Sequence, residues 1–222
     1  MSLTLYLHPL SSFCHKALIA FYENDIPFTP HIVDLGNAES VAAFKKIWPV
    51  GKFPVLHDAA RDRLVPESTS IIEYLTLHYP GRIKLVPDDT ELAAAVREAD
   101  RFYDLSVHVP MQKVITDRLR PAGKNDTFGV EQARELLHTA LDIAERKMAL
   151  RPWATGDQFT MADCAAAPTL FYTDMAIAPL AGAYPHLAAY LGRLKDRPSY
   201  ARVLKEAEPY LHWVPRDNVQ VL

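Results

Sequence analysis

The pattern of apolar residues changes once along this chain, near residue 80, and this change constrains the fold more than any other feature. Before it, short runs that alternate in polarity, as strands do, are mixed with runs of helical spacing. After it, the spacing is helical almost throughout. A chain of 222 residues can bury a substantial core, so we expect an α/β domain followed by an all-α domain.

The first part of the chain predicts strands and helices in the order βαβ-α-ββ-α. One helix should end before Trp48-Pro49, because the residue before a proline is biased away from the helical region. A polar connection between two short β-prone runs predicts a hairpin. The expected strands cover Leu3 to Leu7, Phe28 to Val33, Val55 to His57 and Leu64 to Val65, and the expected helices cover Ser12 to Glu23, Glu39 to Ile47 and Ser68 to His78. We therefore expect a first domain over residues 1–80.

A linker is expected over residues 81–89, where glycine, proline and aspartate interrupt the periodic pattern. The second domain, residues 90–222, should begin with a long helical segment from Thr90 to Leu119 that Pro110 kinks or ends. Further helices are predicted over Phe128 to Leu150, from Thr160, and after Tyr184 and Ser199.

Composition excludes several classes of function. The net charge of −3 argues against nucleic acid as a partner, because no basic stripe is available to neutralise phosphates. No apolar run approaches the length of a membrane span, and the first residues lack the basic start of a signal peptide. Two cysteines are too few for a disulfide framework or a four-cysteine zinc site. We therefore expect a cytoplasmic protein without a metal or a membrane partner.

A binding motif combines the run from Gly51 to Leu56 with the predicted helix that starts at Ser68. The bond before Pro54 holds Phe53 extended, so the backbone of Phe53 is not used by a helix. The start of a helix offers free N–H groups and a positive dipole end, which suit a carboxylate, and Glu67 beside it suits an ammonium. These features predict a site for a zwitterionic amino-acid head with a peptide-like tail, which is the shape of glutathione.

Three groups of residues carry a resemblance to a known family over about residues 3–213. They are Phe53-Pro54-Val55-Leu56 with Glu67-Ser68, the hydroxyl loop from Pro9 to Lys16, and Phe159 to Cys164, where Thr160 and Asp163 have the spacing of a capping box. With these motifs the chain resembles the cytosolic glutathione transferases, and its motif residues are most similar to those of the theta and phi serine classes. The resemblance implies a thioredoxin-like first domain, a helical second domain that forms a hydrophobic substrate site, a cis-proline at Pro54, and a homodimer.

The activity that the resemblance implies is a glutathione transferase with a role in detoxification. Glutathione is the co-substrate, and its thiolate attacks a small hydrophobic electrophile by conjugation, addition or dehalogenation. A free thiol with a pKa of about 8.5 is only a few per cent ionised at pH 7. A serine hydroxyl at the start of the first helix can donate a hydrogen bond to the sulfur, and in the serine classes this hydroxyl falls on Ser11. Ser12 remains the alternative donor, although it also suits the N-cap of this helix, and Ser11 also suits a plain turn.

The same resemblance implies the contacts with glutathione. Phe53 should pair its backbone with the cysteinyl unit, and Glu67 and Ser68 should hold the γ-glutamyl head. Lys52 either meets the glycyl carboxylate or is a solvated lysine. The theta class has a basic residue for this carboxylate in the second helix, whereas this chain has Glu39 there. We therefore expect weaker glutathione binding, or binding through different contacts.

The electrophile site is expected between the long helix after residue 90 and the hydroxyl loop. The candidate walls are Leu10, Phe13, Tyr103, His108 and Met111. A methionine and aromatic residues at helical spacing are more often part of a core. By analogy with the family, Asp100 is expected to approach the γ-glutamyl amine bound to a second subunit.

Two other functions remain open on sequence alone. A glutathione-dependent reductase of disulfides or peroxides would depend on Cys14, although free cysteines such as Cys14 and Cys164 are usually small core residues. A non-catalytic module of the same fold would bind glutathione or another protein without activating a thiol, since fold alone does not fix function.

Overall fold

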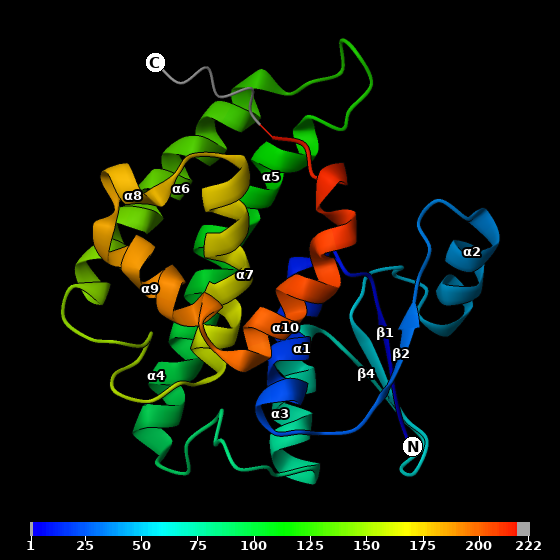
Figure 1. The fold of residues 1–222 in the computed structure, drawn as a ribbon. Helices are drawn as coiled ribbons and strands as arrows, with labels where there is room; N and C mark the ends of the chain where they lie inside the picture. The colour runs from blue at the N-terminus through cyan, green and yellow to red at the C-terminus, as the bar shows by residue number, and fades with distance from the viewer. Residues whose placement is uncertain (1, 217–222) are drawn as a thin grey trace.

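A four-stranded sheet forms one side of the molecule in the computed structural model, which describes residues 2–216 (Figure 1). The strands β1 (Leu3–Leu7), β2 (Thr29–Ile32), β3 (Val55–Asp58) and β4 (Arg63–Pro66) have the spatial order β2-β1-β3-β4. β1 is parallel to β2, and the other two pairings are antiparallel. The helices of this part are α1 (Ser12–Glu23), α2 (Ala38–Ile47) and α3 (Ser68–His78). The predicted order βαβ-α-ββ-α is confirmed.

Alternation along β1 places helices on both faces of the sheet, because successive side chains of a strand point to opposite sides. Leu3, Leu5 and Leu7 are buried in one core with residues of α1 and α3. Tyr6 faces the other side, where its ring centroid lies 5.9 Å from that of Phe44 in α2. The sheet is therefore covered by α1 and α3 on one face and by α2 on the other.

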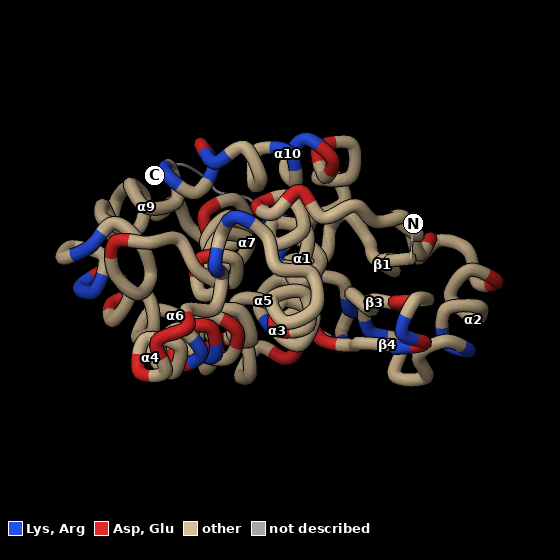
Figure 2. Tube along the Cα trace, turned by 90° about the horizontal axis from the view of Figure 1, so that it is seen from below, with Lys and Arg blue, Asp and Glu red and all other residues tan. Residues whose placement is uncertain are grey.

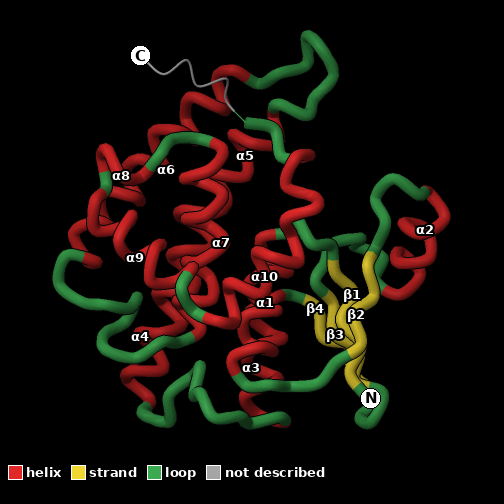
Figure 3. Tube along the Cα trace, in the orientation of Figure 1, coloured by secondary structure: helices red, strands yellow, loops and turns green. Residues whose placement is uncertain are grey.

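The described chain after residue 89 is helical (Figure 3). Its elements are α4 (Thr90–Arg101), a π-helix (Phe102–His108), α5 (Val109–Asp117), α6 (Thr127–Met148), α7 (Met161–Ala176), α8 (Leu180–Ala183), α9 (Pro185–Lys195), α10 (Pro198–Ala207) and a 3₁₀-helix (Glu208–Trp213). The predicted capping box of Thr160 and Asp163 is formed at the start of α7, which is buried almost all round. An α/β thioredoxin-like part followed by a helical part is thus the observed fold.

The long helix after residue 90 differs from the expectation. Pro110 was expected to interrupt it, but Pro110 is the second residue of α5, and the irregularity precedes it as the π-helix. There the N–H of Val109 bonds to the carbonyl of Asp104, five residues back. A proline cannot donate to the carbonyl four residues before it and crowds that carbonyl, which favours a wider turn in the preceding segment.

Smaller differences concern the ends of elements. The second strand is shorter than expected at both ends, and α8 and the 3₁₀-helix were not expected. The predicted second domain extends to residue 222, and its residues 217–222 lie outside the described part.

α1 contacts both parts of the chain. It packs on the sheet and also against α7 and α10. Its last residue, Glu23, accepts hydrogen bonds from Arg197, at 2.5 Å, and from Ser199. Asn24 then exchanges two hydrogen bonds, of 2.7 and 3.0 Å, with the backbone of Ile83 in the connecting segment. These contacts hold the sheet domain and the helical part together.

Charged positions are interspersed along the described chain, with both signs present in each part (Figure 2). None of the helices within residues 2–216 is long and apolar enough to cross a bilayer. The charges that matter most for the site are buried, where α1, α3 and α4 meet.

Candidate functional site

The predicted binding motif forms one continuous corner of the sheet domain. The Phe53-Pro54 peptide bond is cis, as the resemblance implied. After the hairpin the chain turns into α3 at Glu67, whose backbone has a φ of 70°, and the exposed Glu67 side chain makes no capping hydrogen bond. Ser68, the first residue of α3, is buried. The N-terminus of α3 therefore has an exposed carboxylate beside it that does not cap the helix.

A charged groove of about 600 Å³ opens at this corner, between α3 and α4. Glu67 and Ser68 line one wall, and Asp100 and Arg101 line the other. Phe13, which was predicted to contact the electrophile, lies in this groove instead. The groove thus brings the two predicted γ-glutamyl ligands close to two charged side chains, Asp100 and Arg101, that the sequence did not indicate for the site of the same chain.

Beneath the charged groove lies a buried group of charges, the lysine cluster, made by Lys16, Thr69, Asp100, Arg101 and Asp104. The Lys16 ammonium is 1 % exposed and lies 2.6 Å from a carboxylate oxygen of Asp100 and 2.7 Å from one of Asp104. It also donates to the Thr69 hydroxyl at 2.8 Å. Arg101 bonds both carboxylates from the solvent side. Two cations balance two carboxylates, so Glu67 leaves the corner negative overall, which suits an ammonium group.

Asp100 belongs to this cluster, where its side chain is fully buried and paired with Lys16 of the same chain. Its approach to a γ-glutamyl amine on a second subunit stays a prediction. Sequence reasoning missed Lys16, Thr69 and Arg101. A signal for Lys16 was present, because it lies three residues after Phe13 and four before Ala20, on the apolar face of α1.

The hydroxyl loop differs from the expectation in which serine caps the helix. Ser11 is the N-cap of α1, where its Oγ accepts from the Cys14 N–H at 3.3 Å. Ser12 is the first helical residue, and its Oγ lies 2.5 Å from Nε2 of His108. The N-cap interpretation of Ser12 is therefore wrong. Below the loop, the buried His15 bonds the Pro9 carbonyl through Nε2 at 2.6 Å and fixes the loop to α1.

Ser12 lines a second, apolar groove of about 180 Å³ between the loop, α5 and the C-terminal segment. Leu10, His108 and Met111, three of the predicted electrophile contacts, line it too. Its other lining residues are Gln112, Ile115, Thr116, Leu119, Tyr172, Trp213, Val214 and Pro215. The structure thus separates an apolar groove from the charged groove, with the serine loop and Phe13 between them.

Tyr103 is not on a wall of either groove. It is 4 % exposed and belongs to the core, on the side of Asp163 and Tyr190, so the prediction for Tyr103 is corrected. The reason is the π-helix, which begins one residue earlier and directs Asp104 and His108 toward α1, leaving Tyr103 on the core side.

His108 is buried between the two grooves. Its ring centroid lies 4.2 Å from that of Phe13. Burial lowers the pKa of His108 to about 4, and the nearby charge of Lys16 acts in the same direction. The imidazole is therefore neutral at pH 7, and it contacts Ser12 as an uncharged partner.

The glycyl end of the site is the least defined. Lys52 and Glu39 are both exposed, and Glu39 lies in the first turn of α2, where a carboxylate is favourable. The side chain of Lys45 packs against the turn at Gly51. A Cβ added to Gly51 would lie 3.0 Å from Cε of Lys45. Two lysines, Lys45 and Lys52, thus stand near the turn that leads to Phe53.

Both cysteines are fully buried, which confirms that they are core residues. Burial raises the pKa of the Cys14 thiol to about 12, against a smaller opposing effect of Ser11. A protonated thiol without access to solvent is a poor nucleophile, so Cys14 gives no support to a reductase mechanism.

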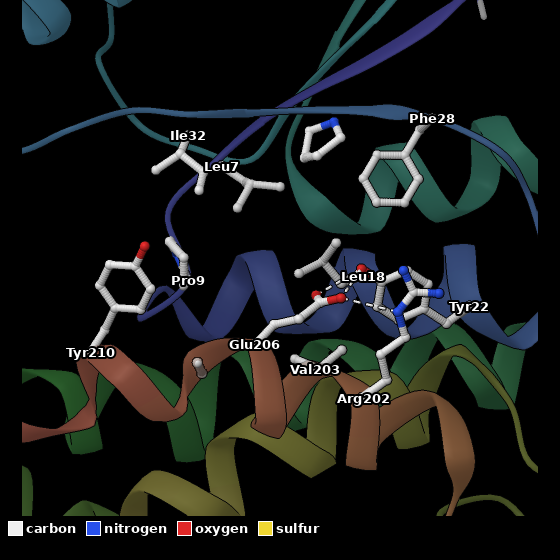
Figure 4. Close-up of a pocket in the computed structure, with 12 residues that line it drawn as sticks. Leu7, Pro9, Leu18, Tyr22, Phe28, Ile32, Arg202, Val203, Glu206 and Tyr210 are labelled. Carbon is white, nitrogen blue, oxygen red and sulfur yellow. Dashed lines mark hydrogen bonds and ion pairs between the residues drawn. The ribbon is translucent and has the colours of Figure 1, made fainter.

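A third cavity, of about 320 Å³, lies on the other side of the hydroxyl loop, between β2, α1 and α10 (Figure 4). Its walls are mostly apolar. Three of its polar side chains bond one another, because Tyr22 donates to Glu206 at 2.7 Å and Arg202 donates to the same carboxylate at 3.0 Å. This cavity contains none of the predicted site residues, so we consider the two grooves for the chemistry.

Comparison with known families covers both parts of the chain. Residues 5–82 match the family model described as "Glutathione S-transferase, N-terminal domain", and residues 127–193 match "Glutathione S-transferase, C-terminal domain". A glutathione S-transferase-like protein, LUC7, from a Fusarium species is 32 % identical over 155 residues, which are 69 % of this chain and 68 % of the relative. Glutathione S-transferase theta-1 from Bos taurus is 30 % identical and covers 88 % of this chain and 83 % of its own length.

Solved structures show the same fold. A glutathione S-transferase from Methylobacillus flagellatus with GSH bound has a TM-score of 0.83 at 25 % identity, covering 91 % of this chain and 98 % of that one. One from Methylobacterium radiotolerans, in complex with glutathione sulfonate, has a TM-score of 0.77 at 25 % identity, covering 96 % and 95 %.

We predict that Lys16→Met destabilises the fold strongly, because it leaves the buried carboxylates of Asp100 and Asp104 without their ammonium. The free energy of unfolding in urea should fall by about 3–5 kcal/mol. Lys195→Met, on the exposed side of α9, is the control. A Lys16→Met protein as stable as this control would contradict the importance of the cluster.

Stability should also fall as the pH drops from 6.5 toward 4. Burial lowers the pKa of both His15 and His108 to about 4, so below 6.5 the unfolded chain binds protons that the folded chain does not. Each histidine contributes a slope that approaches about 1.4 kcal/mol per pH unit in this window. Urea titrations at several pH values measure how steeply the free energy of unfolding falls with pH. This slope should be shallower for the His15→Gln, His108→Gln double variant. A slope equal to that of the wild type would show that the two histidines are not its origin.

Proposed function

Since this chain belongs to the glutathione S-transferase family, we propose that it ionises the thiol of glutathione and directs the thiolate at a hydrophobic electrophile. The observation that carries the proposal is the charged groove, which joins the α3 N-terminus, Glu67 and the lysine cluster beside an apolar groove. Such a pair of sites fits a zwitterionic head and an apolar second substrate. We propose that residues 1–80 hold glutathione and that residues 90–222 supply most of the electrophile site.

In the proposed complex, the γ-glutamyl carboxylate lies at the N-terminus of α3 and accepts from Ser68. Its ammonium faces the Glu67 carboxylate. The cysteinyl unit pairs with the backbone of Phe53 as an added strand, next to the cis-Pro54 bond. The glycyl carboxylate meets Lys52, with Lys45 as a second cation over the same turn.

We propose Ser11 as the donor to the sulfur. Its Oγ already accepts from the Cys14 N–H, so its own proton is available to a ligand. Lowering the thiol pKa by one to two units requires about 1.4–2.7 kcal/mol of thiolate stabilisation. The N-terminus of α1 adds about 0.3–1 kcal/mol to the hydrogen bond. A hydrogen bond to a charged group is worth about 1.5–3 kcal/mol, so the two together are sufficient for this shift. Positioning of the two substrates supplies the remainder of the catalysis.

We also propose a setting for this activity. Cys14 and Cys164 are both unpaired, as expected in a reducing compartment, so we place the protein in the cytoplasm. There it would detoxify small reactive apolar compounds.

A homodimer is proposed from an exposed apolar surface. Leu105 and Val109 are 57 % and 51 % exposed, and Leu136 is 64 % exposed, around a groove of about 730 Å³ between the π-helix, α5 and α6. Isolated monomers rarely leave such a patch uncovered. Leu105→Glu should convert dimers to monomers in light scattering, whereas Leu150→Glu, at an exposed position two residues past the end of α6, should not. A wild-type monomer would refute the dimer.

The test of thiol activation is Ser11→Ala. Turnover of a chloronitrobenzene reagent should fall about 10- to 100-fold, because the hydrogen bond to the thiolate, worth about 1.5–3 kcal/mol, is lost while the N-terminus of α1 stays in place. The ultraviolet absorbance of the bound thiolate should shift to higher pH, while retention on immobilised glutathione should persist.

The outcomes separate the alternatives. Wild-type turnover in Ser11→Ala would remove the role of Ser11. Retention of the wild type without turnover would favour a binding module, and a folded wild type that is not retained would remove glutathione as the ligand.

A further inference from the structure

The contact between Ser12 and His108 has no part in the proposed activation of the thiol by Ser11. The two side chains come from α1 and from the end of the π-helix, and Ser12 Oγ lies 2.5 Å from His108 Nε2. Both residues line the apolar groove. The groove also holds the polar side chains of Gln112, Thr116 and Tyr172. The Thr116 and Tyr172 hydroxyls donate to backbone carbonyls of the protein itself. The few polar groups of a mostly apolar site usually fix the orientation of a ligand.

The direction of this hydrogen bond follows from the other ring nitrogen. Nδ1 of His108 is buried and has no partner among residues 2–216. A neutral imidazole carries one proton, so one of its nitrogens donates and the other accepts. If Ser12 donated to Nε2, the proton would sit on Nδ1 as a buried N–H without an acceptor, which is the rarer and costlier arrangement. The favoured tautomer therefore donates from Nε2 to Ser12.

With its oxygen accepting from His108, Ser12 keeps its own proton for another partner. No second partner takes it within the described part of the chain. Burial and the charge of Lys16 keep the imidazole neutral, so the pair donates without changing its charge. A donor that itself accepts a hydrogen bond is a stronger donor. The Ser12 hydroxyl is thus a polarised donor at the wall of the apolar groove.

We infer that Ser12, positioned by His108, donates to an oxygen of the electrophile, and that the apolar groove selects electrophiles whose reacting carbon is conjugated to a carbonyl group. This inference rests on the proposed transferase function and names the substrate class of the same site. Ser11 and Ser12 then have separate tasks, since one hydroxyl faces the sulfur and the other faces the second substrate.

The step balances as an addition. The thiol proton leaves to water when the thiolate forms. The sulfur then bonds to the β-carbon, the π electron pair of the C=C bond moves toward the carbonyl, and the negative charge develops on the carbonyl oxygen. Ser12 stabilises that oxygen by its hydrogen bond, and water returns a proton to the α-carbon. Donors aimed at a developing oxyanion act mainly in the transition state, so the effect belongs in kcat.

The test compares two electrophiles with the same ring. One is 4-phenylbut-3-en-2-one, a conjugated ketone, and the other is benzyl chloride, which has no oxygen. Ser12→Ala should lower kcat for the ketone by about 10²-fold. It should leave kcat for benzyl chloride and the pH profile of kcat/KM at their wild-type values, because the thiol is activated elsewhere.

His108 is a positioning residue, and two variants test it. His108→Phe keeps the ring against Phe13 but has no N–H, so it should lower kcat for the ketone alone. His108→Gln places an amide N–H near the position of Nε2 and should restore most of that loss. If the His108 variants do not fold, Ser12→Ala still decides, since it removes one oxygen from a partly exposed site.

The outcomes that overturn the inference differ from those that overturn the transferase. Equal loss on both electrophiles, or a shifted pH profile in Ser12→Ala, would place Ser12 on the thiol instead. An unchanged rate with the ketone would remove its role altogether. A wild type that turns over benzyl chloride but not the ketone would overturn the inference and leave the transferase in place. A wild type that turns over neither of them, nor the chloronitrobenzene reagent, would reject the proposed function itself.

Discussion

The buried ammonium of Lys16 is the interaction on which the rest of the site depends. Taking a lysine out of water costs several kcal/mol unless opposite charges and hydrogen bonds compensate it. Here the compensation comes from Asp100 and from Asp104, which lies 88 positions further along the chain, and from Thr69 in α3. Folding α1 therefore requires α3 and α4 in place, and the same requirement sets the wall of the charged groove against Glu67 and Ser68.

The π-helix allows one continuous helical segment, from α4 to His108, to supply side chains to both grooves. Asp100 and Asp104 meet Lys16 in the middle of α1, while His108 meets Ser12 at its first turn. The wider turn before Pro110 keeps these side chains facing α1, although Asp100 lies in α4 and the other two lie in the π-helix. The charged groove and the apolar groove are consequently adjacent, with the serine loop between them, which is the arrangement that two substrates reacting with each other need.

Local patterns predicted much of this structure. The bounds of α1 and α3, the hairpin and the capping box at Thr160 follow from turn chemistry and periodicity, which act over a few residues. The motif at Phe53, Glu67 and Ser68 was recognisable for the same reason. The partners of Lys16 and Ser12 could not be predicted, because these partners lie in elements far away in the sequence. A π-helix differs too little from an α-helix in apolar spacing to be read from sequence, so Tyr103 was placed on the wrong side.

The contacts made by α1 bear on how such chains can recombine during evolution. A crossover near residue 80 looks harmless in the sequence, because it falls in the segment between two patterns. The recombinant chain would nevertheless take Lys16 from one parent and the carboxylates that pair with it from the other. Glu23 and Arg197 would likewise come from different parents. Exchange of whole domains would succeed only between parents that share both pairings, so the two halves of this chain are expected to be inherited together.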